Sequence, residues 1–245
     1  MKTDFIPYGP YLKVLMSLGE WKILDARKIL SLGVLGVGYR DLMKKLERLE
    51  KVGLVNSITK ERSKKFYYLT DMGKKFSCGT STFGVDAEYL THETATSSFL
   101  WELLKYPNFI NGNELLLVGQ NKLDPDAVVK GKINSQEYSL AIEIELTQKS
   151  IKRINEKFRR YGTQTIFDYT VYVTHNQTLL KSYQRALDLL GKKEKAQIIF
   201  LYDENLIDGK LNLNKSLCFY QNNKVNFLKL LKADMGNKRA LDGHL

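Results

Sequence analysis

Residues 123–161, LDPDAVVKGKINSQEYSLAIEIELTQKSIKRINEKFRRY, carry the pattern around which the rest of the chain is organised. Asp124 and Asp126 flank a proline, and Glu143 and Glu145 follow on an apolar segment that is predicted to be a buried strand. Carboxylates at strand ends supply the oxygen ligands that Mg²⁺ prefers. A basic amphipathic helix follows directly, and its cations suit a phosphate backbone. The segment therefore predicts a divalent-cation site beside a surface for a polyanion.

The strand pattern indicates which carboxylates converge. Residues two apart on a strand face the same side, so Glu143 and Glu145 point one way while Ile142, Ile144 and Leu146 point the other. Two carboxylates on one face of an apolar strand repel each other unless a cation lies between them. This favours a functional site. The alternative is a strand at a sheet edge, with both glutamates solvated and paired to lysines of the next helix.

The helix predicted over residues 147–161 places Ile151, Ile154, Phe158 and Tyr161 inward. Its remaining surface carries six basic residues: Lys149, Lys152, Arg153, Lys157, Arg159 and Arg160. They could line a groove that follows a DNA backbone, and we assign Lys152 and Arg153 to DNA contact. For any one of them, a solvated position paired to a glutamate is equally compatible with the sequence.

Charge is unevenly distributed along the 245 residues, whose net charge is +11. Residues 1–77 contain 16 Lys and Arg against 8 Asp and Glu, whereas residues 78–245 contain 22 against 19. This balance favours a polyanionic partner that docks on the N-terminal third. Two distant cysteines, Cys78 and Cys218, exclude a disulfide framework and a zinc knuckle. No 18-residue apolar run occurs, so we expect a cytoplasmic protein without membrane contact.

The N-terminal third predicts a winged helix-turn-helix. Helices are expected over residues 11–18, ending at Gly19, over 24–32, with Asp25 near the start, and over 39–52, closed by Gly53. The apolar stripe of the third helix is Tyr39, Leu42, Met43, Leu46, Leu49 and Val52. Two strands, LVNSIT (54–59) and KFYYLT (65–70), then precede a short helix capped by Thr70 or Asp71. The phrase Tyr67, Leu69, Thr70 and Gly73 resembles the wing of many bacterial regulators.

The predicted winged helix carries its cations on the third helix and on the hairpin. They are Arg40, Lys44, Lys45 and Arg48 on the helix, and Lys60, Arg62, Lys64 and Lys65 on the wing. We expect the helix to enter a major groove while the wing contacts phosphate or the minor groove. The alternatives are that these charges only solvate a surface, or that the unit binds protein.

The remainder of the chain predicts a mixed-sheet domain, so the fold class is a two-domain α+β or α/β protein. Helices are expected over 86–106, 147–161 and 176–190, strands over 114–120, 126–131, 138–146, 169–174 and 197–202, and a final hairpin turning at Asn222–Asn223. The predicted domains are residues 1–77, the winged helix; 78–107, a linker and connecting helix; 108–233, the mixed-sheet domain; and 234–245, a frayed tail.

A strand with an aspartate, a hairpin partner with Glu-x-Lys and a following helix resemble the PD-(D/E)xK nuclease superfamily. The matches are Asp126, in Pro-Asp, with Glu143 and Glu145, in Glu-Ile-Glu. The resemblance implies that these three hold Mg²⁺ or Mn²⁺, which would polarise the scissile phosphate and activate a water. Glu145 stands where most members have lysine, so Lys149 of the following helix is expected to supply the transition-state cation.

The order of short motifs also resembles the replication-relaxation proteins of plasmids and other mobile elements. The matching residues are Leu90 and His92, Leu123 with Pro125, Asp126 and Ala127, Glu143 and Glu145 through Lys149 and Ser150, and Lys157 with Tyr161. The resemblance implies a DNA-associated role in plasmid replication control or mobilisation, with a restriction-endonuclease-like second domain.

Together these patterns predict a DNA-binding protein of a plasmid or other mobile element, acting in replication control or mobilisation. Its second domain would be nuclease-like, and whether it is a Mg²⁺-dependent DNA endonuclease stays open. The alternative is a non-catalytic winged-helix regulator or relaxosome accessory factor whose second domain only binds DNA or dimerises. Expected partners are double-stranded DNA, a second copy of the chain, and plasmid replication or mobilisation proteins.

Overall fold

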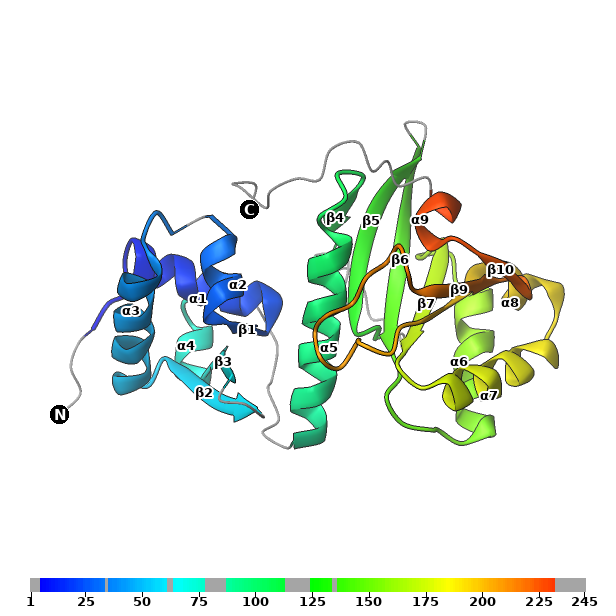
Figure 1. Cartoon of the computed structure of the whole chain (residues 1–245), viewed down its shortest axis with the longest axis horizontal. Helices are drawn as coiled ribbons and strands as arrows, with labels where there is room; N and C mark the ends of the chain where they lie inside the picture. Colours follow the sequence, from blue (N-terminus) through cyan, green and yellow to red (C-terminus); the bar gives the residue numbers. More distant parts are fainter. Residues whose placement is uncertain are drawn as a thin grey trace. The chain divides into compact units, whose positions relative to one another are not determined.

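The computed structural model describes residues 5–33, 35–60, 64–77, 87–112, 124–133 and 136–231 (Figure 1). The chain folds into two compact units, of which the first reaches to Ser97 and the second begins at Ser98. The division falls inside helix α5 (Ala87–Leu103), in the segment predicted as linker and connecting helix. The predicted domain limits at residues 77, 107 and 233 remain predictions.

The first unit contains three short strands and four complete helices among its described residues. These are α1 (Pro10–Trp21), β1 (Ile23–Asp25), α2 (Ala26–Ser31), α3 (Tyr39–Lys51), β2 (Val55–Lys60), β3 (Lys64–Leu69) and α4 (Asp71–Lys74). The strands form an antiparallel sheet of order β1-β3-β2. Three helices, a hairpin and a fourth helix therefore follow one another as predicted, and β1 is an additional strand.

Helix α3 packs on the first unit through Leu42, Leu46 and Leu49, all of which are fully buried. Their spacing of four and three residues places them on one side of the helix. Tyr39, expected on the same stripe, is 49% exposed because it lies at the first turn, outside the packed region. Gly53 follows the helix with a φ of 75°, a left-handed conformation that favours glycine.

The phrase that resembles a regulator wing has a clear packing role. The Thr70 hydroxyl donates to the Gly53 carbonyl at 2.6 Å and accepts the Gly73 N–H at 3.0 Å, so Thr70 is the N-cap of α4. A Cβ at Gly73 would lie 1.9 Å from the Leu54 carbonyl oxygen. Only glycine fits there, and the phrase therefore joins the end of α3 to the start of α4.

Two element boundaries in the first unit differ from the prediction. Helix α1 continues through Gly19, which is buried within it, and ends at Trp21, so packing overrides the local stop signal. The next helix is shorter than predicted because the chain first pairs with β3 as strand β1. Asp25 then caps α2, accepting the N–H groups of Arg27 and Lys28 at 3.0 Å each.

The second unit is built on a seven-stranded mixed sheet of order β10-β9-β8-β7-β6-β5-β4 (Figure 1). Its strands are β4 (Phe109–Asn111), β5 (Ala127–Ile133), β6 (Gln136–Ile144), β7 (Tyr169–Thr174), β8 (Ile198–Tyr202), β9 (Leu217–Tyr220) and β10 (Asn223–Val225). Strands β6, β7 and β8 run parallel to one another, and every other neighbouring pair is antiparallel. The mixed sheet predicted for this part of the chain is therefore confirmed.

Helices α6 (Ile151–Thr163), α7 (Gln177–Asp188) and α8 (Lys192–Gln197) follow in the same unit, with α9 (Phe227–Leu230) near its end. Buried residues of α6 and α7 pack with one face of the sheet (Figure 1). The centre of this core is aromatic: the Phe158 ring meets Tyr172 edge-on at a centroid distance of 5.0 Å and Phe200 at 6.0 Å. The same sheet face carries the predicted carboxylate site.

Helix α6 begins later than predicted. Its first residue is Ile151, and the Ser150 hydroxyl caps it by accepting the Arg153 N–H at 3.4 Å. Lys149 therefore lies before the helix instead of within it. Ile151, predicted to point inward, is 48% exposed because the packed stripe starts only at Ile154.

Further differences concern strand β4, the final hairpin and the short helices. Strand β6 also ends at Ile144 instead of Leu146, and α5 ends at Leu103 instead of Tyr106. Strand β4 and helices α8 and α9 have no counterpart in the prediction. The hairpin turns at Gln221 and Asn222, with φ values of 49° and 65°, one residue earlier than predicted. The strand predicted over 114–120, residue Leu123, most of the predicted linker and the predicted tail lie outside the described residues. Within the described ranges, every helix is too short or too polar to cross a lipid bilayer.

Candidate nucleic-acid interface and carboxylate site

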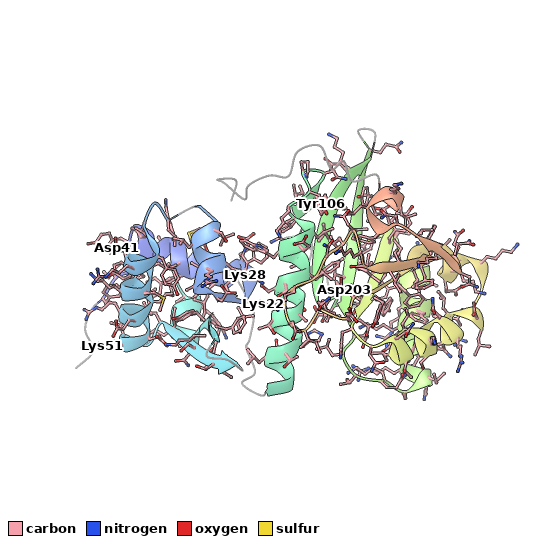
Figure 2. The ribbon with its side chains drawn as sticks, in the orientation of Figure 1. Lys22, Lys28, Asp41, Lys51, Tyr106 and Asp203 are labelled. Atoms are coloured by element: carbon pink, nitrogen blue, oxygen red, sulfur yellow. The ribbon has the colours of Figure 1, made fainter. Side chains whose placement is uncertain are left out.

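The outer face of α3 carries a row of cations. Arg40, Lys44 and Arg48 follow one another at four-residue spacing, and all three are exposed. Figure 2 shows Asp41 and Lys51 near the two ends of the same helix. A regular row of exposed cations on one helix face has the charge and access that phosphate contacts require.

Two cations of α3 make cation–π contacts with aromatic rings. The Arg48 guanidinium lies 5.5 Å from the centre of the Phe5 ring, and the Lys45 ammonium lies 5.1 Å from that of Tyr11. The two rings pack edge-to-face with centroids 5.2 Å apart. Cations over a ring face are attracted by its quadrupole. Lys45 is consequently half-buried, unlike the exposed Arg40 and Lys44.

The wing cation Lys65 is held by α3. Its ammonium lies 2.8 Å from Glu50 Oε2 and 5.2 Å from the centre of the Tyr67 ring. Burial and the Glu50 carboxylate together raise the pKa of Tyr67 to about 12. Lys65 thus fastens the wing to the helix. Of the other predicted wing contacts, Arg62 and the side chains of Lys60 and Lys64 lie outside the described part of the chain.

The predicted carboxylates gather where β5 and β6 pair. Asp126 directly precedes β5, and its Oδ2 accepts the N–H of Ile144 at 2.7 Å. Glu143 lies near the end of β6 and Glu145 just beyond it, and the two residues are 1% and 6% exposed. Two adjacent, same-face carboxylates with so little water around them require a partner cation.

Lys157 of α6 is that cation. Its ammonium donates a short hydrogen bond to Glu143 Oε2 and lies 3.7 Å from Glu145 Oε1. The Tyr161 hydroxyl, one helical turn later, donates a short hydrogen bond to Glu143 Oε1. Both oxygens of Glu143 are therefore engaged, and one lysine bridges the two glutamates. This contact confirms that Glu143 and Glu145 face the same side of the strand.

The low polarity of this position shifts the pKa values of all three groups. Burial raises the pKa of Glu143 to about 7, against the opposing charge of Lys157, and the charge of Asp126 adds to the rise. Burial alone would lower the pKa of Lys157, but the charge and hydrogen bond of Glu143 raise it above its ordinary value. Burial and the charge of Glu143 raise the pKa of Tyr161. At neutral pH the lysine is charged, and Glu143 lies near its titration midpoint.

The other cations predicted for this site lie elsewhere. The half-buried Lys149 donates its ammonium N–H to the Thr147 hydroxyl at 3.1 Å, so it is not the cation between the glutamates. Lys152 and Arg153 are exposed on α6. Lys157 is one of the six surface cations of the predicted helix, and Tyr161 is one of its apolar residues. Their four-residue spacing, which places both on the side facing Glu143, is the signal that could have paired them.

Two tyrosines of the site carry no signal in the sequence. Tyr172 of β7 pairs in register with Glu143, and Tyr183 comes from α7. They line a small cavity with Glu145 and Thr174. Burial first, and the charge of Glu145 second, raise the pKa of Tyr183. The Tyr172 hydroxyl is buried without a hydrogen-bond partner among the described residues, and the rest of the cavity lining is mostly apolar.

The carboxylates do not fit a divalent metal as they stand. A hard cation needs several oxygens directed at one point. Here Asp126 Oδ2 is bound to a backbone N–H, and both Glu143 oxygens accept other hydrogen bonds. Across the described ranges, no three His, Cys, Asp or Glu side chains are grouped so that they could hold a metal ion. The predicted Mg²⁺ or Mn²⁺ site is therefore not formed in this arrangement.

Comparison with known proteins adds little to this geometry. No protein-family model and no curated protein sequence matches the chain, so the resemblance to replication-relaxation proteins is not confirmed. A solved structure of the restriction endonuclease FokI bound to DNA aligns with 81% of this chain at 13% identity and a TM-score of 0.30. The alignment spans 43% of that structure's chain. A likeness this weak carries no argument about fold or activity.

Proposed function

We propose that this protein binds double-stranded DNA through an N-terminal winged helix, with α3 as the recognition helix. The exposed row of Arg40, Lys44 and Arg48 carries the proposal. The order of helices and strands in the first unit supports it, as does the excess of 16 basic over 8 acidic residues before position 78. Such a row would follow phosphates while the start of the helix reaches base edges.

Charge reversal on α3 tests DNA binding directly. We expect the variant Arg40→Glu, Lys44→Glu, Arg48→Glu to lose binding to a duplex oligonucleotide in fluorescence anisotropy. Where residual binding is measurable, the plot of log association constant against log salt concentration should be shallower. The magnitude of its negative slope should decrease by about 2.7, or about 0.9 for each lost phosphate contact. The matched control is Lys210→Glu, Lys215→Glu, Lys224→Glu, which changes three exposed lysines and alters net charge equally. Equal losses in both variants would contradict a specific role for α3.

DNA cleavage by the second unit is the second candidate function. The observation in its favour is the grouping of Asp126, Glu143, Glu145 and Lys157 where the start of β5 lies beside the end of β6. Supercoiled and linear DNA incubated with Mg²⁺ or Mn²⁺ provides the test, beside the variants Asp126→Ala and Glu143→Ala. Nicking by the native chain that both variants lack would establish a nuclease. Intact DNA under every condition would leave a nuclease-shaped domain that binds DNA or dimerises.

A role in plasmid replication control or mobilisation is a finer proposal. It rests on the order of short motifs along the chain, including Asp126, Glu143, Glu145 and the pair Lys157 and Tyr161. Selection of bound fragments from a randomised duplex pool would test it. An enriched motif that occurs at plasmid origins or transfer sites would support the proposal, and an enriched motif found only at chromosomal promoters would contradict it.

A further inference from the structure

The Lys157 ammonium occupies the position that the nuclease hypothesis reserves for a metal ion. It lies against Glu143 and is 3.7 Å from Glu145, which are two of the three predicted metal ligands. The third, Asp126, contributes to the charge around Lys157 but directs Oδ2 at the Ile144 N–H. The positive charge that these carboxylates need is therefore supplied from within the chain.

The surroundings of Lys157 fix it in this position. The side chain is only 33% exposed, and Glu143 beside it is almost completely buried. Tyr161 binds the other oxygen of Glu143 and so prevents that carboxylate from turning toward a new ligand. A metal ion would have to displace the ammonium, the phenol or both. Each displacement leaves a polar group buried without its partner, which opposes metal entry.

We propose that Lys157 is a built-in substitute for the divalent metal, and that it excludes metal ions from the carboxylate site. The second unit is then a metal-independent variant of a nuclease-like core, closed by an ion pair between α6 and β6. Removing the lysine charge should convert the same residues into a divalent-cation site, because the carboxylates would retain their places and lose the counterion that Lys157 supplies. The inference does not depend on DNA binding by the first unit.

Mn²⁺ titration of the purified full chain tests the proposal, with the free-ion electron paramagnetic resonance signal as the readout. The native protein should show no saturable Mn²⁺ binding at millimolar concentrations. Lys157→Met and Lys157→Gln remove the charge and should bind one Mn²⁺ saturably. Their Kd should lie at least about tenfold, or about 1.4 kcal/mol, below the highest Mn²⁺ concentration at which the native protein shows no saturation. Adding Glu143→Gln and Glu145→Gln to either variant should abolish that binding. Lys181→Met, which removes an exposed lysine of α7, should behave as the native protein does.

Thermal unfolding provides a second readout in case the neutral variants, Lys157→Met and Lys157→Gln, are unstable. Mn²⁺ should raise the Tm of Lys157→Met or restore its helical circular dichroism, and it should leave the native Tm unchanged, because a ligand stabilises only the state that binds it. Saturable Mn²⁺ binding by the native chain that Glu143→Gln abolishes would overturn the proposal. So would neutral variants, folded or unfolded, that do not respond to Mn²⁺.

Discussion

Helices α3 and α6 are matched in length and in number of basic residues, but their cations have different partners. Each has 13 residues, five of which are Lys or Arg, and each packs through a narrow apolar stripe. In α3, Arg40, Lys44 and Arg48 remain exposed to solvent. In α6, Lys157 instead turns inward and joins two buried glutamates.

The difference shows that the partner of each cation on a basic helix depends on which residues of neighbouring elements face it. Strand β6 brings Glu143 and Glu145 against α6, and the cost of burying them fixes Lys157 in place. On α3, the acidic residue Glu50 belongs to the helix's own last turn, and it pairs with Lys65 of the wing and not with the exposed row. Although the two helices have similar charge patterns, we expect the exposed row of α3 to bind an anion from outside the chain, whereas Lys157 of α6 pairs with glutamates of the chain itself.

Removing the half-buried Lys157, the counterion of the buried Glu143, should have the largest effect on stability. We expect Lys157→Met to lower the free energy of unfolding by about 3 kcal/mol, because it leaves Glu143 buried without its counterion. On α3, the substitutions Arg40→Met and Lys44→Met should each change it by less than about 0.5 kcal/mol. Urea unfolding at neutral pH measures both. A comparable loss from the α3 substitutions would remove the distinction between the helices.

The titration of Glu143 should give stability a pH dependence that α3 lacks. In the folded protein Glu143 holds its proton up to about pH 7, whereas an unfolded chain releases it near about pH 4.3. The protonated folded form is therefore favoured at low pH, and this contribution is lost as pH rises from about 5 through 7.

Comparison with Glu143→Gln, which cannot titrate, isolates this contribution. The difference in unfolding free energy, native minus Glu143→Gln, should grow as the pH falls from about 7 to about 5, by at most about 1.4 kcal/mol per pH unit. Urea unfolding across that range measures it. A difference that grows with rising pH would show that the ion pair with Lys157 outweighs burial and holds Glu143 ionised.

The charges of α3 and α6 should also differ in their sensitivity to salt. Interactions of exposed charges are screened within a Debye length of about 8 Å at physiological ionic strength, but buried pairs are screened much less. The stability lost in Lys157→Met should then change by less than about 0.5 kcal/mol when salt is raised tenfold. DNA affinity, in contrast, should fall steeply over the same range. If the loss of unfolding free energy caused by Lys157→Met depended strongly on salt, the ion pair between Lys157 and Glu143 would be exposed to solvent.

The smallest expected effect concerns the rings beneath α3. Phe5→Ala and Tyr11→Ala remove the cation–π contacts of Arg48 and Lys45, each worth about 0.5–1 kcal/mol at exposed sites. We expect DNA affinity to fall about two- to fivefold, with the salt slope unchanged because no phosphate contact is lost. Phe5→Tyr should restore affinity, because another aromatic ring can carry the same contact.

Much of the fold could be predicted because its elements have strong local signals. The alternating apolar residues of β6, the leucine stripe of α3 and the capping residue Thr70 each specify an element within a few residues. The misplaced boundaries have tertiary causes. Gly19 stays helical because it is buried, and β1 forms because β3 offers it a pairing edge.

The candidate site could be predicted only in part. Two-residue alternation correctly placed Glu143 and Glu145 on the same side of the chain at the end of β6. The predicted cation, Lys149, was wrong. Lys149 is nearer to the glutamates in sequence, but it precedes the cap of α6. Lys157 lies about two helical turns further along the chain and faces the strand. Tyr172 and Tyr183 come from elements whose packing no local pattern reveals.

The Thr70 hydroxyl, which bonds both Gly53 and Gly73, has a mechanical consequence. It joins the exit of α3 to the exit of the wing, and Lys65 ties the same strand to Glu50 near the end of α3. Among the described residues, helix α3 and strand β3 of the predicted wing are therefore held together at two points. If α3 enters a major groove, the wing must meet the backbone at a fixed offset, so groove width itself becomes a criterion by which DNA sites are accepted or refused.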